Sequence, residues 1–168
     1  MLGRRHTAWA ILAIALAAFI LVATVLTVDA RAALRESSAE QAFAAALNRV
    51  RAAHGLPRLQ IEPALVDSAR AHSDEMVATD TFEHGSAWWR RLVRAGATGT
   101  HVGENIGWCA DSVCPSGAPA TLVGEWLASP DHRANILDPR FSHVGVGIAV
   151  GPFHGWDSAY VVTTDFDG

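Results

Sequence analysis

Four short stretches of the chain hold side chains that could do chemistry. They contain histidines, carboxylates and hydroxyls, and they are residues 82–86, 103–106, 126–137 and 143–147. Neutral imidazole and carboxylate groups suit zinc or a similar divalent ion, which lowers the pKa of a bound water toward neutrality and so favours hydrolysis. The same residue types also have structural uses, because a histidine can donate to a backbone carbonyl and a carboxylate can accept from backbone amides of a turn.

Signatures of the common hydrolases are absent from the sequence. The chain has no Gly-x-Ser-x-Gly motif and no His-Glu-x-x-His motif. Neither of its two cysteines has a neighbouring histidine that could activate it. The four stretches therefore do not by themselves identify a reaction.

The two cysteines, Cys109 and Cys114, lie in the stretch Cys-Ala-Asp-Ser-Val-Cys-Pro. We predict that they form a disulfide, because the export argued below places them in an oxidising compartment. A loop this short contributes about 2 kcal/mol in the chain-entropy model, enough to fix a local excursion of the chain. The alternatives are two unpaired thiols, or a metal site that lacks both the spacing and the second cysteine pair of zinc knuckles.

Helical periodicity predicts five helices after residue 37. The first covers about residues 39–54, between a capping box and Gly55, and the second begins at Pro63. His72 lies on the apolar stripe of the second helix, so a hydrogen-bonded core histidine is expected there rather than a ligand. Three short helices are expected around residues 88–93, 122–127 and 130–136, the last with Ser129 as its N-cap.

Two strands are expected at the end of the chain. Residues 144–150 alternate Val or Ile with Gly or Ala, the period of a strand, and residues 159–166 form its expected hairpin partner. A face of small residues lets another backbone approach closely, so both faces of the strand should be covered. Because helices come first and strands last, we predict an α+β fold with a mostly antiparallel sheet.

The order and spacing of the four stretches resemble the bacterial branch of the CAP superfamily. This superfamily includes cysteine-rich secretory proteins, plant pathogenesis-related proteins and many bacterial secreted proteins, and the likeness runs from about Ala44 to Phe166. The resemblance implies a three-layer α-β-α sandwich with a central cavity lined by two histidines and acidic residues. On this sequence the histidines match His84 and His132, and the first acidic residue matches Glu104.

The second acidic residue of the family is missing. Animal and plant members carry it three residues after the tryptophan that is here Trp126, where this chain has Ser129. Glu125 precedes Trp126 and points to another side of the helix, so the role is not transferred to it. The loss of this carboxylate lowers the negative charge of the site and weakens the binding of any cation there. The resemblance thus implies a cavity of His84, Glu104, Ser129 and His132, with His84 and His132 as metal ligands and Glu104 as the candidate catalytic group.

Several other residues have structural interpretations. His101 closely precedes Glu104 and is a further candidate near the site, whereas the sequence does not place His143 or His154. Arg133 and Asn135 are expected to tie the last short helix to its neighbours. Five tryptophans are expected to wall the core and the cavity rim; they are Trp88, Trp89, Trp108, Trp126 and Trp156.

The N-terminus carries a membrane-directed segment. Residues 8–28 are 21 residues with no charged side chain, and as a helix they cover about 30 Å, the thickness of the hydrocarbon core of a bilayer. Arg4 and Arg5 precede the segment and favour a cytoplasmic N-terminus, so that the rest of the chain is exported.

The fate of this segment is open. Ala30-Arg31-Ala32 matches a small-x-small cleavage pattern, but the apolar core is longer than that of a typical signal peptide. We therefore predict a signal peptide or membrane anchor at residues 1–35 and one extracellular or cell-envelope domain at residues 36–168, secreted or anchored.

The charge composition of the chain limits the kinds of partner that it can bind. The formal charge is −4 and the basic residues are arginines dispersed among acids, so a nucleic-acid partner is excluded. Three functions remain. The first is a module that binds an envelope lipid, a cell-wall fragment or a protein; the second is a zinc-assisted hydrolase of peptides or wall polymers; the third is a structural envelope protein without a ligand.

Overall fold

The computed structural model describes residues 38–97, 100–114 and 118–168. Contacts group residues 38–168 into one compact unit. The predicted membrane-directed segment, residues 8–28, and the cleavage pattern at residues 30–32 lie outside the described residues. Within the part of the chain that is described, no helix is both long enough and apolar enough to cross a membrane.

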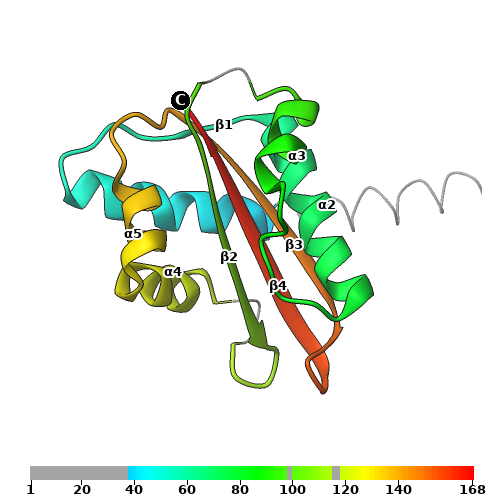
Figure 1. Cartoon of the computed structure of the whole chain (residues 1–168). Coiled ribbons are helices and arrows are strands. Elements are labelled where there is room, and N and C mark those ends of the chain that lie inside the picture. Colours follow the sequence, from blue (N-terminus) through cyan, green and yellow to red (C-terminus); the bar gives the residue numbers. More distant parts are fainter. Residues whose placement is uncertain (1–37, 98–99, 115–117) are drawn as a thin grey trace, which may run out of the picture. The chain divides into compact units, whose positions relative to one another are not determined.

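The two long helices form where the sequence predicts them. The opening helix covers residues 38–53, and α2 covers Pro63–Thr79 with its proline in the first turn (Figure 1). The predicted stripe of α2 is buried, which places His72 in the core. Phe43 and Leu47 of the opening helix are also fully buried.

Three short helices complete the helical part of the described chain. They are α3 (Trp88–Ala95), α4 (Pro119–Ala128) and α5 (Pro130–Leu137). Ser129 stands at the N-cap of α5 with extended backbone, as predicted, although its hydroxyl makes no capping hydrogen bond. The backbone N–H of Ser129 instead bonds to the last carbonyls of α4, because the residue joins the two helices directly.

The sheet has the strand order β1-β3-β4-β2. β3 (His143–Phe153) and β4 (Trp156–Asp167) form the predicted hairpin, and β2 (Val102–Ala110) pairs antiparallel with β4. β1 (Gln60–Ile61) pairs parallel with β3, so the sheet is mixed and the expectation of a mostly antiparallel sheet is corrected. A two-residue strand is too short to show any alternation in sequence, so the sequence contains no signal for β1.

Helices cover both faces of the sheet, as predicted from the alternating strand (Figure 1). A Cβ added to Gly145 would lie 2.0 Å from the carbonyl carbon of Leu65, and one added to Gly147 would lie 2.1 Å from the backbone nitrogen of Arg70. Only glycine lets α2 approach β3 this closely. Val144 and Val146 face the other way, into the core formed with the opening helix, α4 and α5. The fold is therefore α+β, as predicted.

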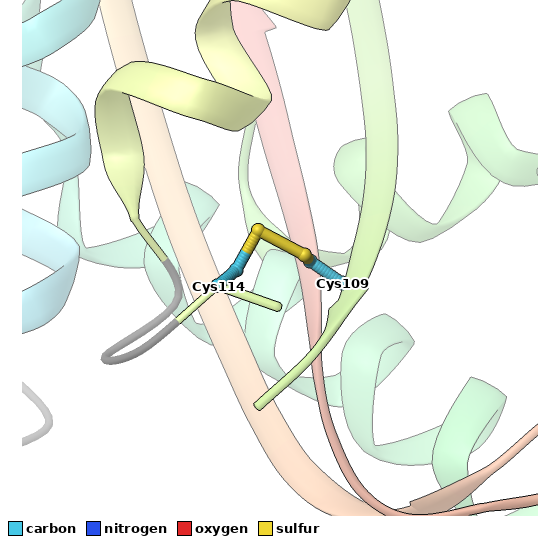
Figure 2. The surroundings of a disulfide bond; sticks show 2 residues. All are labelled: Cys109 and Cys114. Carbon is cyan, nitrogen blue, oxygen red and sulfur yellow. A yellow bond between two sulfur atoms is a disulfide. The ribbon is translucent and has the colours of Figure 1, made fainter. Parts of the chain in front are cut away.

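The predicted disulfide is confirmed. Cys109, near the end of β2, is bonded to Cys114 in the turn that follows (Figure 2). The bond holds this turn against the end of the strand.

Candidate functional site

A cleft with a volume of about 550 Å³ lies beside β2, which is an edge strand of the sheet. Its walls come from the loop before α3, from Trp88 of α3, from the start of β2 and from the first turns of α5. All four residues that the sequence predicts for the cavity line this cleft: His84, Glu104, Ser129 and His132. Segments far apart in the chain thus meet around one solvent-reachable hollow.

Glu104 is the buried member of this group, and its side chain has no exposed surface. His84 Nδ1 lies 2.7 Å from Glu104 Oε1, and the guanidinium of Arg91 donates to Oε2. Because an ionised carboxylate only accepts hydrogen bonds, Nδ1 of His84 must carry the proton. Nε2 of a neutral His84 is then an acceptor, on a side chain that is 41% exposed.

Arg91 continues the contacts into the interior. Its Nη1 donates to Asp165 Oδ2 at 2.7 Å and to the hydroxyl and carbonyl of Ser68 in α2 at 2.6 and 3.0 Å. Glu104 and Asp165 stand directly opposite each other in the β2–β4 register. One guanidinium therefore serves two neighbouring buried carboxylates.

Asp165 is the most perturbed acid of this group. Burial raises the pKa of Asp165 to about 7 and the neighbouring Glu104 adds to the rise, while Arg91 and Ser68 oppose it. Asp165 Oδ1 has no hydrogen-bond partner among the described residues. A buried carboxylate oxygen in this state costs stability, so its retention needs an explanation.

His132 is positioned by two amide side chains. Asn105 Nδ2 donates to the carbonyl of His132 at 3.1 Å, and Asn135 Nδ2 donates to the carbonyl of Glu104 at 3.0 Å. Asn135 thus ties α5 to β2, as predicted. The rings of His132 and His84 lie 6.2 Å apart, centre to centre. Burial lowers the pKa of His132, His84 lowers it further, and Asp131 opposes the shift.

Some of the groups that the sequence predicts as metal ligands are already engaged in hydrogen bonds. Both oxygens of Glu104 are taken, one of them by the cation Arg91, which leaves His84 Nε2 and the ring of His132 as donors. Among residues 38–97, 100–114 and 118–168, no group of three His, Cys, Asp or Glu side chains is placed to hold a metal ion. Zinc sites in proteins use three or four such ligands, so this arrangement does not fit one, and the metal assignment stays a prediction.

Four other histidines lie away from the cleft lining. His72 is a core residue whose Nε2 is 3.0 Å from the carbonyl of Glu83, and burial lowers its pKa. His101, the further candidate, is paired with Asp138 at 2.9 Å and stacked on Phe141. His143 and His154 lie in β3 and in the turn after it. None of these four lines the cleft.

Two residues that sequence reasoning missed complete the site. In the sequence, Arg91 is one of two adjacent arginines in a predicted short helix. Asp165 is one polar residue in a predicted strand that also contains Val and Thr. A carboxylate inside a strand with apolar neighbours is a usable signal, because such a group needs a partner when buried. The sequence contains no corresponding signal that would choose Arg91 over Arg90.

The family model of the cysteine-rich secretory protein family, CAP, matches residues 44–166. The chain is 36% identical over 104 residues to the uncharacterized protein YkwD of Bacillus subtilis, covering 60% of this chain and 38% of the relative. It is 28% identical over 117 residues to the uncharacterized membrane protein YlbC of the same bacterium, covering 67% and 32%. The chain therefore spans about a third of the length of these two curated relatives.

Solved structures share the fold. An extracellular protein containing an SCP domain from Bacillus anthracis aligns with a TM-score of 0.63 and 29% identity, over 79% of this chain and 41% of that one. An outer surface protein of Borrelia burgdorferi aligns with a TM-score of 0.60 and 15% identity, over 78% and 94%. Because the family model covers most of the chain, including the cleft residues, this protein belongs to the CAP, or cysteine-rich secretory protein, family.

Proposed function

We propose that the domain is an exported binding module whose cleft holds a hydroxyl-bearing fragment of the cell wall. The observation that carries the proposal is the meeting of His84, held by Glu104, with His132 in one open cleft. Export is supported by the N-terminal apolar segment and by a family that is typically extracellular.

The cleft offers a mixed set of hydrogen-bonding groups. Ser86 and Ser129 bring hydroxyls that both donate and accept, while Asp131 and Nε2 of His84 accept. A sugar hydroxyl also donates and accepts, so it can be satisfied at each of these positions. Trp88 adds an aromatic surface, which suits the apolar face of a sugar ring.

A lipid ligand suits this cleft less well. Among the described residues that line it, only Trp88 and Val102 carry large apolar side chains. An acyl chain gains its binding energy from apolar contact. It would leave the polar side chains that line the cleft without hydrogen-bond partners. The second predicted function, a zinc-assisted hydrolase, has no specific support, because the carboxylate that would serve it is already paired.

Calorimetric titration of the full chain in mild detergent tests the proposal. The probe is the soluble tetramer of β-1,4-linked N-acetylglucosamine, with phosphatidylglycerol vesicles as the lipid comparison. We expect saturable binding of the tetramer that is weakened by His132→Ala and by Trp88→Ala. Trp89→Ala is the matched control, because Trp89 is exposed on the same helix and does not line the cleft.

Three results would contradict the proposal. The first is the absence of saturable binding to the tetramer and to a soluble digest of cell wall. The second is binding to the vesicles alone, which would favour a lipid ligand. The third concerns the place of binding. Equal losses in Trp88→Ala and Trp89→Ala would place the binding surface outside the cleft.

A further inference from the structure

Contacts between side chains run from the interior of the domain to the cleft. Asp165 and Ser68 hold one end of the Arg91 guanidinium, Arg91 holds Glu104, and Glu104 holds His84. Both carboxylates have no exposed surface, and the side chain of Arg91 is 19% exposed. Only the last member of this series, His84, reaches the cleft as a substantially exposed group.

The geometry requires an arginine. Nη1 serves Asp165 and Ser68 while Nη2 serves Glu104, so the planar fork is used at both ends. A lysine ammonium is a compact charge without this fixed fork. Two carboxylates on adjacent strands also repel each other, and the shared cation compensates the repulsion.

A purely structural role explains this group poorly. Buried ion pairs are on average no more stabilising than apolar residues of similar volume, and here the fold also retains Asp165 Oδ1 without a partner. What the arrangement achieves is a single orientation of the Glu104 carboxylate. One oxygen is committed to Arg91, and the other must face His84.

We propose that Arg91 is a positioning residue of the cleft. It fixes the orientation of Glu104, and Glu104 in turn fixes His84 with the proton on Nδ1 and with Nε2 offered to the ligand. Asp165 and Ser68 hold Arg91 in place from behind. The part of this inference that concerns the ligand rests on the proposed function, whereas the part that concerns the orientation of His84 does not.

Nitrogen NMR of the histidine rings in the full chain tests the inference, because the ¹⁵N shifts separate the two neutral tautomers. His84→Gln identifies the His84 signals. In the wild type we expect the Nδ1–H tautomer. In Glu104→Gln, Arg91 should still take the side-chain oxygen, so that the amide NH₂ faces His84 and the tautomer changes to Nε2–H.

Removal of Arg91 should abolish this effect. In Glu104→Gln/Arg91→Met the amide is free to rotate and present its oxygen to His84, so we expect the Nδ1–H tautomer to return in at least part of the population. The double variant loses one positive and one negative charge together, which protects it from the misfolding that Arg91→Met alone could cause. Arg90→Met in the Glu104→Gln background is the matched control, because Arg90 is exposed and its guanidinium lies over Trp89.

Ligand binding supplies the second readout. We expect Glu104→Gln to bind the N-acetylglucosamine tetramer roughly tenfold more weakly than the wild type, with Arg90→Met unchanged. If Glu104→Gln keeps the Nδ1–H tautomer, or if Arg91→Met does not alter the tautomer of Glu104→Gln, the inference is wrong. A wild type that fails to bind the tetramer contradicts the proposed function alone, since the tautomer series still decides the role of Arg91.

Discussion

Two arginines with several interior contacts hold this domain together in different ways. Arg51 of the opening helix is completely buried and donates to four backbone carbonyls, those of Pro57, Ile136, Asp138 and Phe141, at 2.8–3.0 Å. Arg91 of α3 is partly exposed and donates mainly to side chains, including two carboxylates.

This difference in partners distinguishes an arginine with a structural role, Arg51, from an arginine next to the cleft, Arg91. Backbone carbonyls do not titrate, so the contacts of Arg51 have a structural role: they fix the connection after the opening helix, the end of α5 and the segment after α5 to the opening helix. Burial lowers the pKa of Arg51, and the charge of Asp138 opposes the shift. The partners of Arg91 include two titratable carboxylates, one of which contacts the partly exposed His84, so we expect the region around Arg91 to respond to pH.

The largest expected effect comes from Arg51→Met. It would leave buried carbonyls, including those of Ile136 and Phe141, without their donors, and each such loss costs about 1–3 kcal/mol. We therefore expect the free energy of unfolding to fall by at least about 3 kcal/mol, measured by urea unfolding of the full chain. A loss of less than about 1 kcal/mol would show that Arg51 is not a structural centre.

For Arg91, the expected loss of stability depends on the number of buried carboxylates that are left without a cation. Arg91→Met leaves two buried carboxylates without a cation and should cost about 3 kcal/mol. Adding Glu104→Gln removes one of these charges, so the double variant should be more stable than Arg91→Met. The same urea experiment measures Arg91→Met, Glu104→Gln and the double variant. If the losses of the two single variants simply add in the double variant, Arg91 and Glu104 do not interact energetically and the contrast with Arg51 fails.

Asp165 should make stability depend on pH. Its pKa is raised to about 7 in the folded protein, against about 3.9 in an unfolded chain. Between these values the folded state holds one more proton, so the free energy of unfolding falls as pH rises, by at most about 1.4 kcal/mol per unit, and levels off above the folded pKa.

The groups that face Asp165 are Arg91 from α3, Glu104 from β2 and the Ser68 hydroxyl from α2. Other titrating groups, such as His132, contribute equally to wild type and variant, so the measurement is the difference between the wild type and Asp165→Asn from pH 4 to 8. We expect the wild type to lose stability relative to the variant as pH rises. Parallel profiles would contradict the raised pKa.

The smallest expected effect concerns zinc. With Glu104 committed to His84 and Arg91, two imidazoles remain, so calorimetric titration of the full chain with zinc chloride should show only weak binding that His132→Ala removes and Arg90→Met leaves unchanged. A tight one-to-one site that is lost in Glu104→Gln would show that Glu104 leaves Arg91 to become a ligand.

Local signals predicted most of the helices and the final hairpin. Pro63 opens α2, Gly96 ends α3, and the alternation of residues 144–150 forms β3, because each of these depends on neighbours within a few residues. β2 was not predicted. Its backbone is extended through pairing with β4, and glycines at 103 and 107 make room for Phe141 and Trp126 instead of showing an apolar alternation.

The sequence by itself determined the family, the disulfide between Cys109 and Cys114 and the identity of the cleft residues His84, Glu104, Ser129 and His132, because short motifs in a given order carry that information. Only the tertiary structure decided what Glu104 does. Its partner Arg91 comes from α3, and Asp165, the second carboxylate bound by Arg91, comes from β4, about sixty residues further along the chain. Which cation binds a buried carboxylate depends on strand register and on how closely α3 approaches the sheet, and no local pattern encodes that distance.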